Sequence, residues 1–390
     1  MKIEKINLDG LTLLLYSDEE IIENYAKITI NYGSNQNENY PEGIAHFLEH
    51  VKFASSQGDY FDFFTKNLAN SNAYTSYNQT SYYFTSYTNF IDNLKILIEM
   101  CTNIYLTNET IKKERKIIEQ EINMYLQEPE WILRNYVFDS LCINTNYGVD
   151  IAGSVDSINK ITIKDLEDIF HKYYQKSNMI ISIITNKHKE EIIEIINQRF
   201  NKMNNKKIEI PEKYESLEIK ESYVEKKFNN LNKEIMSYSY KFNYDLNLID
   251  YFTLLIIKEN FSKINDKYEK YYHNKKINKT LEISIVFEKD FKMINFEMIG
   301  TNQKEFMEII DELFEINEYT EILIKRIIGK ELKKYDDPYK LINLYEKLEL
   351  MNLNVDDYFK TLNELNVEKI KNSYEKLTCF VKKSFTFLNK

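Results

Sequence analysis

Residues 41–53 read PEGIAHFLEHVKF, and this stretch combines a helix pattern with a group of side chains that can bind a metal. Its apolar residues recur at the spacing of one helix face: Ile44, Phe47, Leu48 and Val51. Pro41 near the first turn favours a helix start there. At 100° per residue, His46, Glu49 and His50 fall together on the opposite side, with the two histidines one turn apart. The spacing therefore predicts a helix whose two imidazoles can reach one cation.

A pair of histidines four residues apart can also simply cover a solvated helix face. Histidine is rare in this chain, with 5 residues in 390, and a chance H-x-x-E-H match in such a chain is on the order of one per cent. We therefore favour the metal interpretation. Two histidines are an incomplete site, because catalytic zinc usually has three protein ligands and an open position for water.

A third ligand is predicted in residues 111–126, IKKERKIIEQEINMYL. One face of this expected helix is apolar: Ile111, Ile117, Ile118, Ile122 and Tyr125. Glu114 and Glu121 fall within that face, and burying a carboxylate costs several kcal/mol unless it is paired or binds a cation. We assign Glu121 as the third zinc ligand and Glu114 as an acceptor for a ligand imidazole. The alternative is that both carboxylates pair with buried Arg or Lys.

These parts predict a mechanism. Zinc lowers the pKa of a bound water to about 7 and polarises a peptide carbonyl. Glu49, beside the metal but not a ligand, is placed to act as general base and then to pass the proton to the leaving amine.

Outside this region, strand-like runs alternate with longer helical segments, which predicts an α+β fold with mixed sheets covered by helices. The expected strands of the first half are 11–16, 25–32, 81–87 and 178–185. The second half repeats the order, with strands at 235–242, 281–287, 291–299 and 377–385, a helix at 248–264 and further helices from 302 onward. We predict two similar α/β domains, 1–205 and 221–390, joined by a polar linker at 206–220.

Composition narrows the classes of function. The chain is 43% hydrophobic with a net charge of −10, and its lysines form no basic patch, so nucleic acid is not an expected partner. The three cysteines, Cys101, Cys142 and Cys379, fit neither a disulfide framework nor a cysteine zinc site. We find no signal peptide and no apolar run of about 20 residues, so we expect a cytoplasmic protein that does not span a membrane.

These motifs resemble those of the pitrilysin-like inverted zincins, a family that includes insulin-degrading enzymes and mitochondrial processing peptidases. His46 to His50 matches the H-F-L-E-H box, and Glu114 to Glu121 matches the downstream E-x6-E element, in which the second Glu binds zinc. The likeness spans nearly the whole chain. It implies a zinc metalloendopeptidase with one ion per chain, built as one half of a clam-shaped peptidase.

Further residues are assigned through this resemblance. Residues 70–76 resemble the N-A-x-T strand whose edge pairs with substrate, which implies that Asn72, Ala73 and Tyr74 bind the peptide. Taken alone, the stretch could equally be a tyrosine-rich hairpin of the core. Trp131 is a candidate for the border of the cleft, although a lone tryptophan is more often a core residue.

The chain has the length of half-size bacterial and mitochondrial members, which assemble in pairs. Active pairs take an Arg and a Tyr, seven residues apart, from the second domain of the opposing half. The matching region, 260–284, contains tyrosines but no Arg. We therefore predict a heterodimer with a homologous subunit that supplies this pair.

Two other functions compete with the peptidase. One is a noncatalytic, peptide-binding or structural subunit of such a dimer, and the other is a metal-binding scaffold without hydrolysis. The presence of Glu49 and of both ligand elements favours the enzyme. The implied chamber favours unfolded or short peptides, including precursor or leader peptides, as substrates. No spacing links His171, His188 or His273 to the metal.

Overall fold

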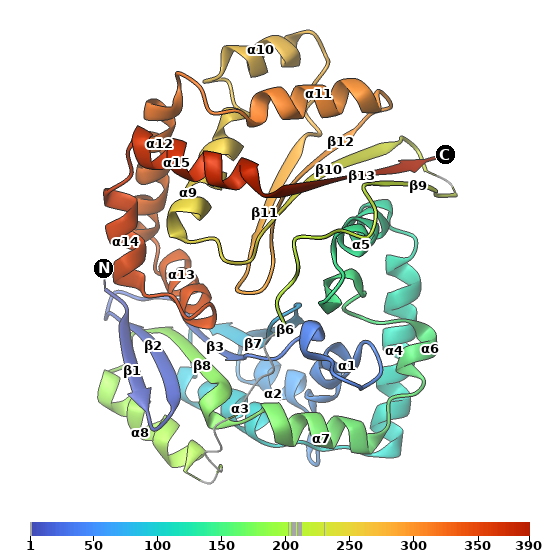
Figure 1. Ribbon diagram of the computed structural model, residues 1–390. Helices are drawn as coiled ribbons and strands as arrows, with labels where there is room; N and C mark the ends of the chain where they lie inside the picture. Colours follow the sequence, from blue (N-terminus) through green and yellow to red (C-terminus); the bar gives the residue numbers. More distant parts are fainter. Residues whose placement is uncertain (1, 202, 204–207, 209–212, 230) are drawn as a thin grey trace. The chain divides into compact units, whose positions relative to one another are not determined.

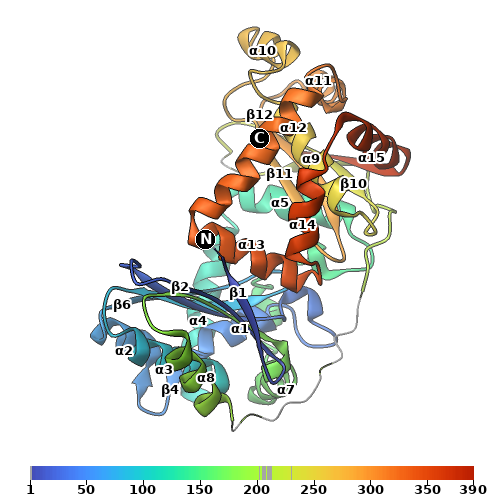
Figure 2. The ribbon, with the colours of Figure 1, turned by 90° about the vertical axis from the view of Figure 1, so that its left-hand side faces the viewer.

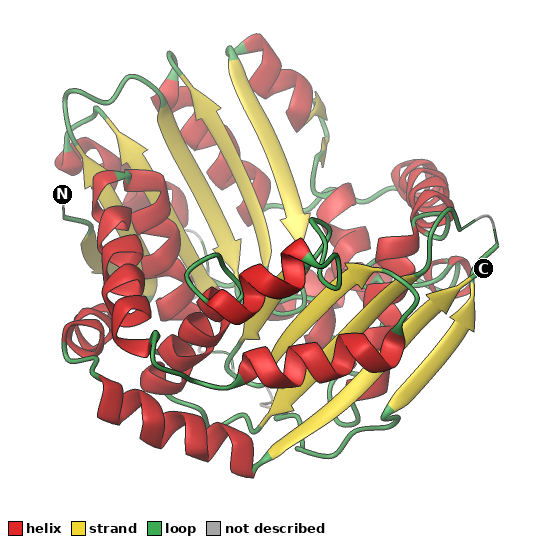
Figure 3. Cartoon of the chain, turned by 90° about the horizontal axis from the view of Figure 1, so that it is seen from above, coloured by secondary structure: helices red, strands yellow, loops and turns green. Residues whose placement is uncertain are grey.

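The computed structural model describes residues 2–390 except 202, 204–207, 209–212 and 230. Contacts between residues divide the chain into two compact units. Unit 1 comprises Met1–Met124, Val149–Pro211 and Lys334–Leu350, and unit 2 comprises Tyr125–Gly148, Glu212–Lys333 and Met351–Lys390. Each unit contains one main sheet with helices packed against it (Figures 1, 2 and 3).

Unit 1 is built on a six-stranded sheet with the order β1-β2-β8-β3-β7-β6. The strands are β1 (Glu4–Leu8), β2 (Leu11–Ser17), β3 (Asn24–Ile30), β6 (Ala69–Thr75), β7 (Thr80–Ser86) and β8 (Met179–Thr185). The helices are α1 (Ile44–Val51), α2 (Tyr60–Lys66), α3 (Phe90–Thr102), α4 (Asn108–Tyr125), α6 (Val155–Ile158), α7 (Ile163–Tyr173), α8 (Lys189–Phe200) and α13 (Pro338–Leu350). Strands β2 and β8 are parallel, and the other neighbours are antiparallel.

Unit 2 is built on a five-stranded sheet with the order β11-β12-β10-β13-β9. The strands are β9 (Tyr223–Lys227), β10 (Ile235–Phe242), β11 (Glu282–Phe287), β12 (Lys292–Ile299) and β13 (Val381–Asn389). The helices are α5 (Pro129–Leu141), α9 (Leu248–Asn260), α10 (Asp266–His273), α11 (Gln303–Phe314), α12 (Thr320–Leu332), α14 (Val355–Asn363) and α15 (Val367–Cys379). Strands β9 and β13 are parallel, and the other neighbours are antiparallel.

The two sheets share one topology. The series β2-β8-β3-β7-β6 and the series β9-β13-β10-β12-β11 have the same order along the chain and the same strand directions. Helices α1 and α2 lie between β3 and β6, as α9 and α10 lie between β10 and β11. The α+β prediction with two similar domains is confirmed, and the second unit carries the fold without an H-x-x-E-H helix.

The two faces of the unit 1 sheet differ: one packs on the main core, and the other carries buried polar side chains among its apolar ones. Ile181 and Ile183 of β8 point into the main core, whereas Ser182 lies on the other face, where α13 packs. There Glu346 of α13 lies 2.9 Å from Nζ of Lys27 and accepts a hydrogen bond from Ser182 at 2.6 Å. Both charged side chains are almost fully buried, so each compensates the other's loss of water. This explains why a late segment of the chain belongs to unit 1.

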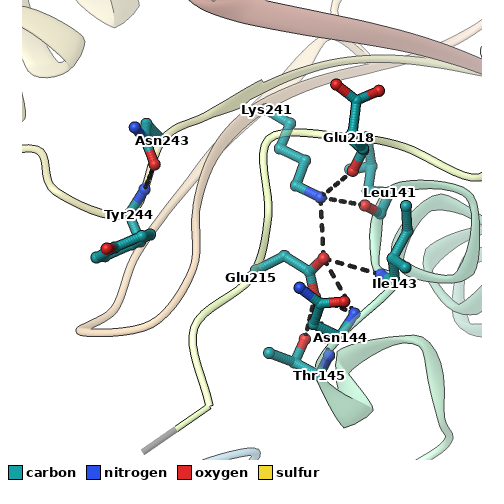
Figure 4. A network of polar contacts seen from close by, with 9 residues as sticks. All are labelled: Leu141, Ile143, Asn144, Thr145, Glu215, Glu218, Lys241, Asn243 and Tyr244. Carbon is teal, nitrogen blue, oxygen red and sulfur yellow. Dashed lines mark hydrogen bonds and ion pairs between the residues drawn. The ribbon is translucent and has the colours of Figure 1, made fainter.

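Unit boundaries therefore differ from the predicted domains 1–205 and 221–390 in two segments. Residues 334–350 return to unit 1 through α13, and residues 125–148 belong to unit 2, because α5 packs on β10 and β13. The predicted linker, 206–220, lies partly outside the described residues. Its described end carries Glu215, which is anchored in unit 2 (Figure 4).

Most predicted elements agree with the structure to within a few residues. Three boundaries were wrong. The last strand begins at Val381, because Leu377 packs into the core as part of α15. Helix α9 ends at Asn260 rather than 264, and α1 begins at Ile44, after Pro41. Within the described part of the chain, no helix has the length and apolar character needed to cross a membrane.

Candidate metal centre

Helix α1 begins abruptly after Gly43, whose φ is 84°, a left-handed conformation that favours glycine. A Cβ at this position would lie 2.4 Å from the carbonyl oxygen of Ala152. The helix therefore starts where two backbone segments meet closely. Its apolar face is fully buried, and the opposite face is also shielded: His46 is 9% exposed and Glu49 8% exposed. These side chains do not cover a solvated face.

Helix α4 brings two carboxylates to α1. Its buried residues are Ile111, Ile118 and Ile122, whereas the predicted core residue Ile117 is 40% exposed. Arg115 fixes the helix in place. Its guanidinium donates to the carbonyl oxygens of Ile158 at 3.2 Å and Ile161 at 2.7 Å. The same group lies over the ring of Phe47 on α1. Glu114 and Glu121 thereby face the helix that carries the histidines.

The three predicted ligands converge. Oε2 of Glu121 lies 3.3 Å from Nε2 of His50 and 3.7 Å from Nε2 of His46, and one ligand atom from each residue lies within 4.8 Å of the others. A tetrahedral zinc ion with bonds of about 2.0–2.2 Å holds its ligand atoms about 3.3–3.5 Å apart. The donor set of two nitrogens and one carboxylate oxygen suits such an ion, and the oxygen–nitrogen distances of 3.3 and 3.7 Å are close to that spacing.

The predicted acceptor Glu114 lies beside His50. Its Oε2 is 3.5 Å from Nδ1 of His50, and its Oε1 is 3.4 Å from Nζ of Lys113. A carboxylate at Nδ1 favours the tautomer whose Nε2 lone pair can bind a metal. Nδ1 of His46, by contrast, is buried and has no hydrogen-bond partner among the described residues.

The surroundings of the two histidines shift their pKa values in opposite directions. Burial, with a contribution from His50, lowers the pKa of His46 to about 4. Burial alone would also lower the pKa of His50, but its contacts with Glu114 and Glu121 outweigh burial and raise the pKa to about 9. The pKa of Glu114 is lowered, because the contacts with His50 and Lys113 outweigh its burial. A cluster of two imidazoles and three carboxyl groups with little access to water is compensated best by a cation.

Glu49 completes the centre without being one of the converging ligands. Burial raises its pKa to about 7, against a hydrogen bond from Thr75 and the charge of His50. A carboxyl group with a pKa near neutrality can accept and return a proton, as a general base requires.

Family models match both parts of the chain. The model described as Insulinase (Peptidase family M16) matches residues 14–154, which include all these side chains, and the Peptidase M16 inactive domain matches residues 160–316. The chain belongs to the insulinase family of peptidases.

Relatives within this family cover the chain to different extents. The "Uncharacterized zinc protease YmfH" of Bacillus subtilis is 28% identical over 93% of this chain and 91% of its own length. The mitochondrial-processing peptidase subunit beta of Bos taurus is 32% identical over 47% of this chain and 38% of its own length. The crystal structure of a putative M16-like peptidase from Alicyclobacillus acidocaldarius has a TM-score of 0.89 at 21% identity and covers 99% of this chain and 98% of its own, which shows a shared fold.

The N-A-x-T strand of this insulinase-family chain is β6, an edge strand of the unit 1 sheet. Asn72 and Tyr74 are exposed on one face, whereas Ala73 packs against the core on the other. Substrate binding by these residues stays a prediction. Trp131 lies on α5 in unit 2, where its ring stacks on Tyr125 with centroids 4.0 Å apart and under the Arg134 guanidinium. The assignment of Trp131 to the border of the cleft stays a prediction.

Sequence reasoning missed two residues of the centre, Thr75 and Arg115. Thr75 donates to Glu49 at 2.6 Å, and alternation along β6 from Ala73 could have placed it on the α1 side. Arg115 carries no such signal, because its partners are backbone carbonyls that only the fold brings near.

Proposed function

We propose that this chain is the catalytic half of a zinc metalloendopeptidase, with one zinc ion held by His46, His50 and Glu121. The observation that carries the proposal is the convergence of two Nε2 atoms and a carboxylate oxygen beside a second, buried carboxyl group, Glu49. The noncatalytic subunit is the weaker alternative, because a chain that only binds peptides does not need Glu49 in this costly position.

Zinc supplies an acidified water and polarisation of the scissile carbonyl when it is bound. Within the chain, Glu114 holds the His50 ring by Nδ1, and Glu49 accepts a proton from the attacking water. Glu49 then returns that proton to the nitrogen of the leaving amine. No covalent bond forms between the chain and the peptide.

Substrate binding is proposed on the open edge of β6, where an extended peptide adds a further strand and pairs with the backbone near Asn72, Ala73 and Tyr74. Such pairing requires an extended backbone, so unfolded or short peptides are the proposed substrates, with precursor or leader peptides as one class. Trp131 remains a candidate residue for contact with the peptide substrate. We place the activity in the cytoplasm, in keeping with the free cysteines Cys101, Cys142 and Cys379.

The first experiment measures zinc content and cleavage of a quenched peptide library for the wild type, Glu49→Gln and the control Glu109→Gln, an exposed carboxyl on α4. Stoichiometric zinc in all three, with cleavage lost only in Glu49→Gln, supports the peptidase. Zinc-free protein, or cleavage unaffected by Glu49→Gln, favours the peptide-binding subunit.

A heterodimer is proposed because residues 260–284 contain no Arg. The test compares the purified chain alone with the chain co-expressed with a homologue that carries the Arg and Tyr pair. Activity that appears only in the mixture, and disappears when that Arg is changed, supports the heterodimer. A homodimer with full activity contradicts it.

A further inference from the structure

The hydroxyl of Thr75 donates to Oε2 of Glu49 at 2.6 Å, and this contact joins the edge strand to the base. Glu49 lies on α1 and Thr75 is the last residue of β6. A hydrogen bond to a charged acceptor is among the stronger contacts that a neutral side chain can make. Glu49 is not one of the proposed metal ligands, so no bond to a metal holds its carboxyl group. The hydrogen bond from Thr75 therefore restricts the rotation of that group.

Strand geometry explains why Thr75 faces the metal centre. Side chains alternate along β6, so that Ala73 and Thr75 point to one face while Asn72 and Tyr74 are exposed on the other. Ala73 packs against the main core, and β6 packs against α1. The exposed positions and the edge are therefore open to a peptide, and the face that carries Thr75 is directed to the catalytic helix.

Thr75 is itself held by the turn that follows it. The turn residue Ser76 bonds through its backbone N–H to the carbonyl of Gln79 at 2.8 Å, and its own carbonyl accepts from the N–H of Ser34 at 3.1 Å. A second bond, from the N–H of Asn35 to the carbonyl of Tyr77, is 2.7 Å long. Gly33 permits this contact, since a Cβ there would lie 2.4 Å from the Ser76 oxygen. The hydroxyl donor is thus fixed by backbone bonds to another segment.

We propose that Thr75 is a positioning residue that orients the Glu49 carboxylate for proton transfer and links it to the strand on which the peptide is bound. This rests on the proposed function, because it assumes that Glu49 is the base and that β6 receives substrate. Strand β6 then both pairs with the peptide backbone and carries the Thr75 hydroxyl that orients Glu49. Loss of the hydroxyl impairs the chemical step and leaves peptide binding in place.

The test uses a matched pair of substitutions in the zinc-loaded protein, with its partner subunit if one is required. Thr75→Val keeps the shape and removes the donor, whereas Thr75→Ser keeps the donor. We expect Thr75→Val to lower kcat about tenfold or more with KM within about twofold of the wild type. Thr75→Ser should retain most of kcat. Thr85→Val, a half-buried threonine on β7, is the matched control and should leave kcat unchanged.

A readout independent of turnover comes from crystal structures of the zinc-loaded variants. We expect the Glu49 carboxylate to leave its wild-type position, or to occupy more than one rotamer, in Thr75→Val but not in Thr75→Ser. Zinc affinity should stay within about twofold in both, because Thr75 contacts no ligand in the described structure. A single unchanged Glu49 rotamer in Thr75→Val, or an unchanged kcat, overturns the inference.

These outcomes are separable from failure of the proposed function. If Glu49→Gln abolishes cleavage and Thr75→Val does not reduce it, the peptidase stands and the role of Thr75 falls. If Glu49→Gln cleaves normally, the proposed function falls, and the inference falls with it.

Discussion

Nδ1 of His50 lies 3.5 Å from Oε2 of Glu114, while Nε2 of the same ring lies 3.3 Å from Oε2 of Glu121. One helix, α4, therefore contacts both nitrogens of a single imidazole on α1. In the proposed zinc site, the first contact would select the tautomer and ring orientation of His50, and the second would place an oxygen of the third proposed ligand beside it. The E-x6-E spacing of Glu114 and Glu121 thus places one carboxylate at each ring nitrogen of His50.

Glu114→Gln is expected to weaken zinc binding about 10- to 100-fold, because an amide orients the His50 ring less strongly than a carboxylate does. Competition with a chromogenic chelator measures the affinity. Glu109→Gln changes an exposed carboxyl on the same helix and should leave the affinity unchanged. Equal affinities in the two variants would show that Glu114 does not orient His50.

The buried ion pair of unit 2 offers a test of stability (Figure 4). Glu215 accepts from Nζ of Lys241 at 3.2 Å and from the N–H of Ile143 at 2.8 Å and of Thr145 at 3.0 Å. Glu215→Ala leaves a buried ammonium and several amides without this acceptor, so we expect a loss of about 3–5 kcal/mol in the free energy of unfolding. Urea denaturation measures it.

Two further variants control that experiment. Lys241→Met combined with Glu215→Gln should cost less than Glu215→Ala alone, because no unpaired charge remains buried. Lys382→Met removes an exposed pair with Glu218, whose charged atoms lie 3.8 Å apart, and should change stability by less than about 0.5 kcal/mol. A Glu215→Ala cost as small as that of Lys382→Met would contradict the prediction.

Gly43→Ala should destabilise the protein by about 2 kcal/mol or more, since the new Cβ meets the carbonyl of Ala152 and the φ of 84° is strained for alanine. Because Gly43 starts α1, zinc affinity should fall as well. Gly329→Ala in α12 has nothing within 4 Å of the added atom and should stabilise by about 0.5–1 kcal/mol. Thermal unfolding with and without zinc compares the two, and similar effects of both substitutions would refute the steric argument.

Glu297 predicts a pH dependence of stability. Burial, together with the charges of Glu282 and Glu130, raises its pKa from 4.5 in the unfolded chain to about 7, against the opposing charge of Arg134. A raised carboxyl pKa means that its favourable contribution is complete below about pH 4.5 and is lost as the pH rises through about 7. At pH 8 the folded state bears the full cost of this partly buried charge.

Glu297→Gln removes that cost, so it should stabilise the protein by about 1–3 kcal/mol at pH 8 and have little effect at pH 4.5. Denaturant unfolding at the two pH values measures the difference. Glu375→Gln, an exposed carboxyl on α15, should change stability by less than about 0.5 kcal/mol at either pH. A Glu297→Gln effect that does not depend on pH would exclude titration as its cause.

By itself, the sequence determined most of the elements and indicated a candidate set of metal ligands. The apolar period of residues 41–53 and the motif spacing identified His46, His50 and Glu121, because helix geometry is local and repeats every few residues. The alternation of strand and helix predicted two similar α/β domains for the same reason.

Tertiary structure alone decided which distant segments meet. Packing placed α13 on the sheet face that carries Lys27. It also brought Thr75 to Glu49 and let Arg115 donate to the carbonyls of Ile158 and Ile161. All three contacts join residues far apart along the chain, and those of Arg115 are made to backbone carbonyls that every residue carries, so no local spacing rule identifies the partners. Burial of Glu49, which raises its pKa to about 7, likewise arises from the neighbours that the fold supplies.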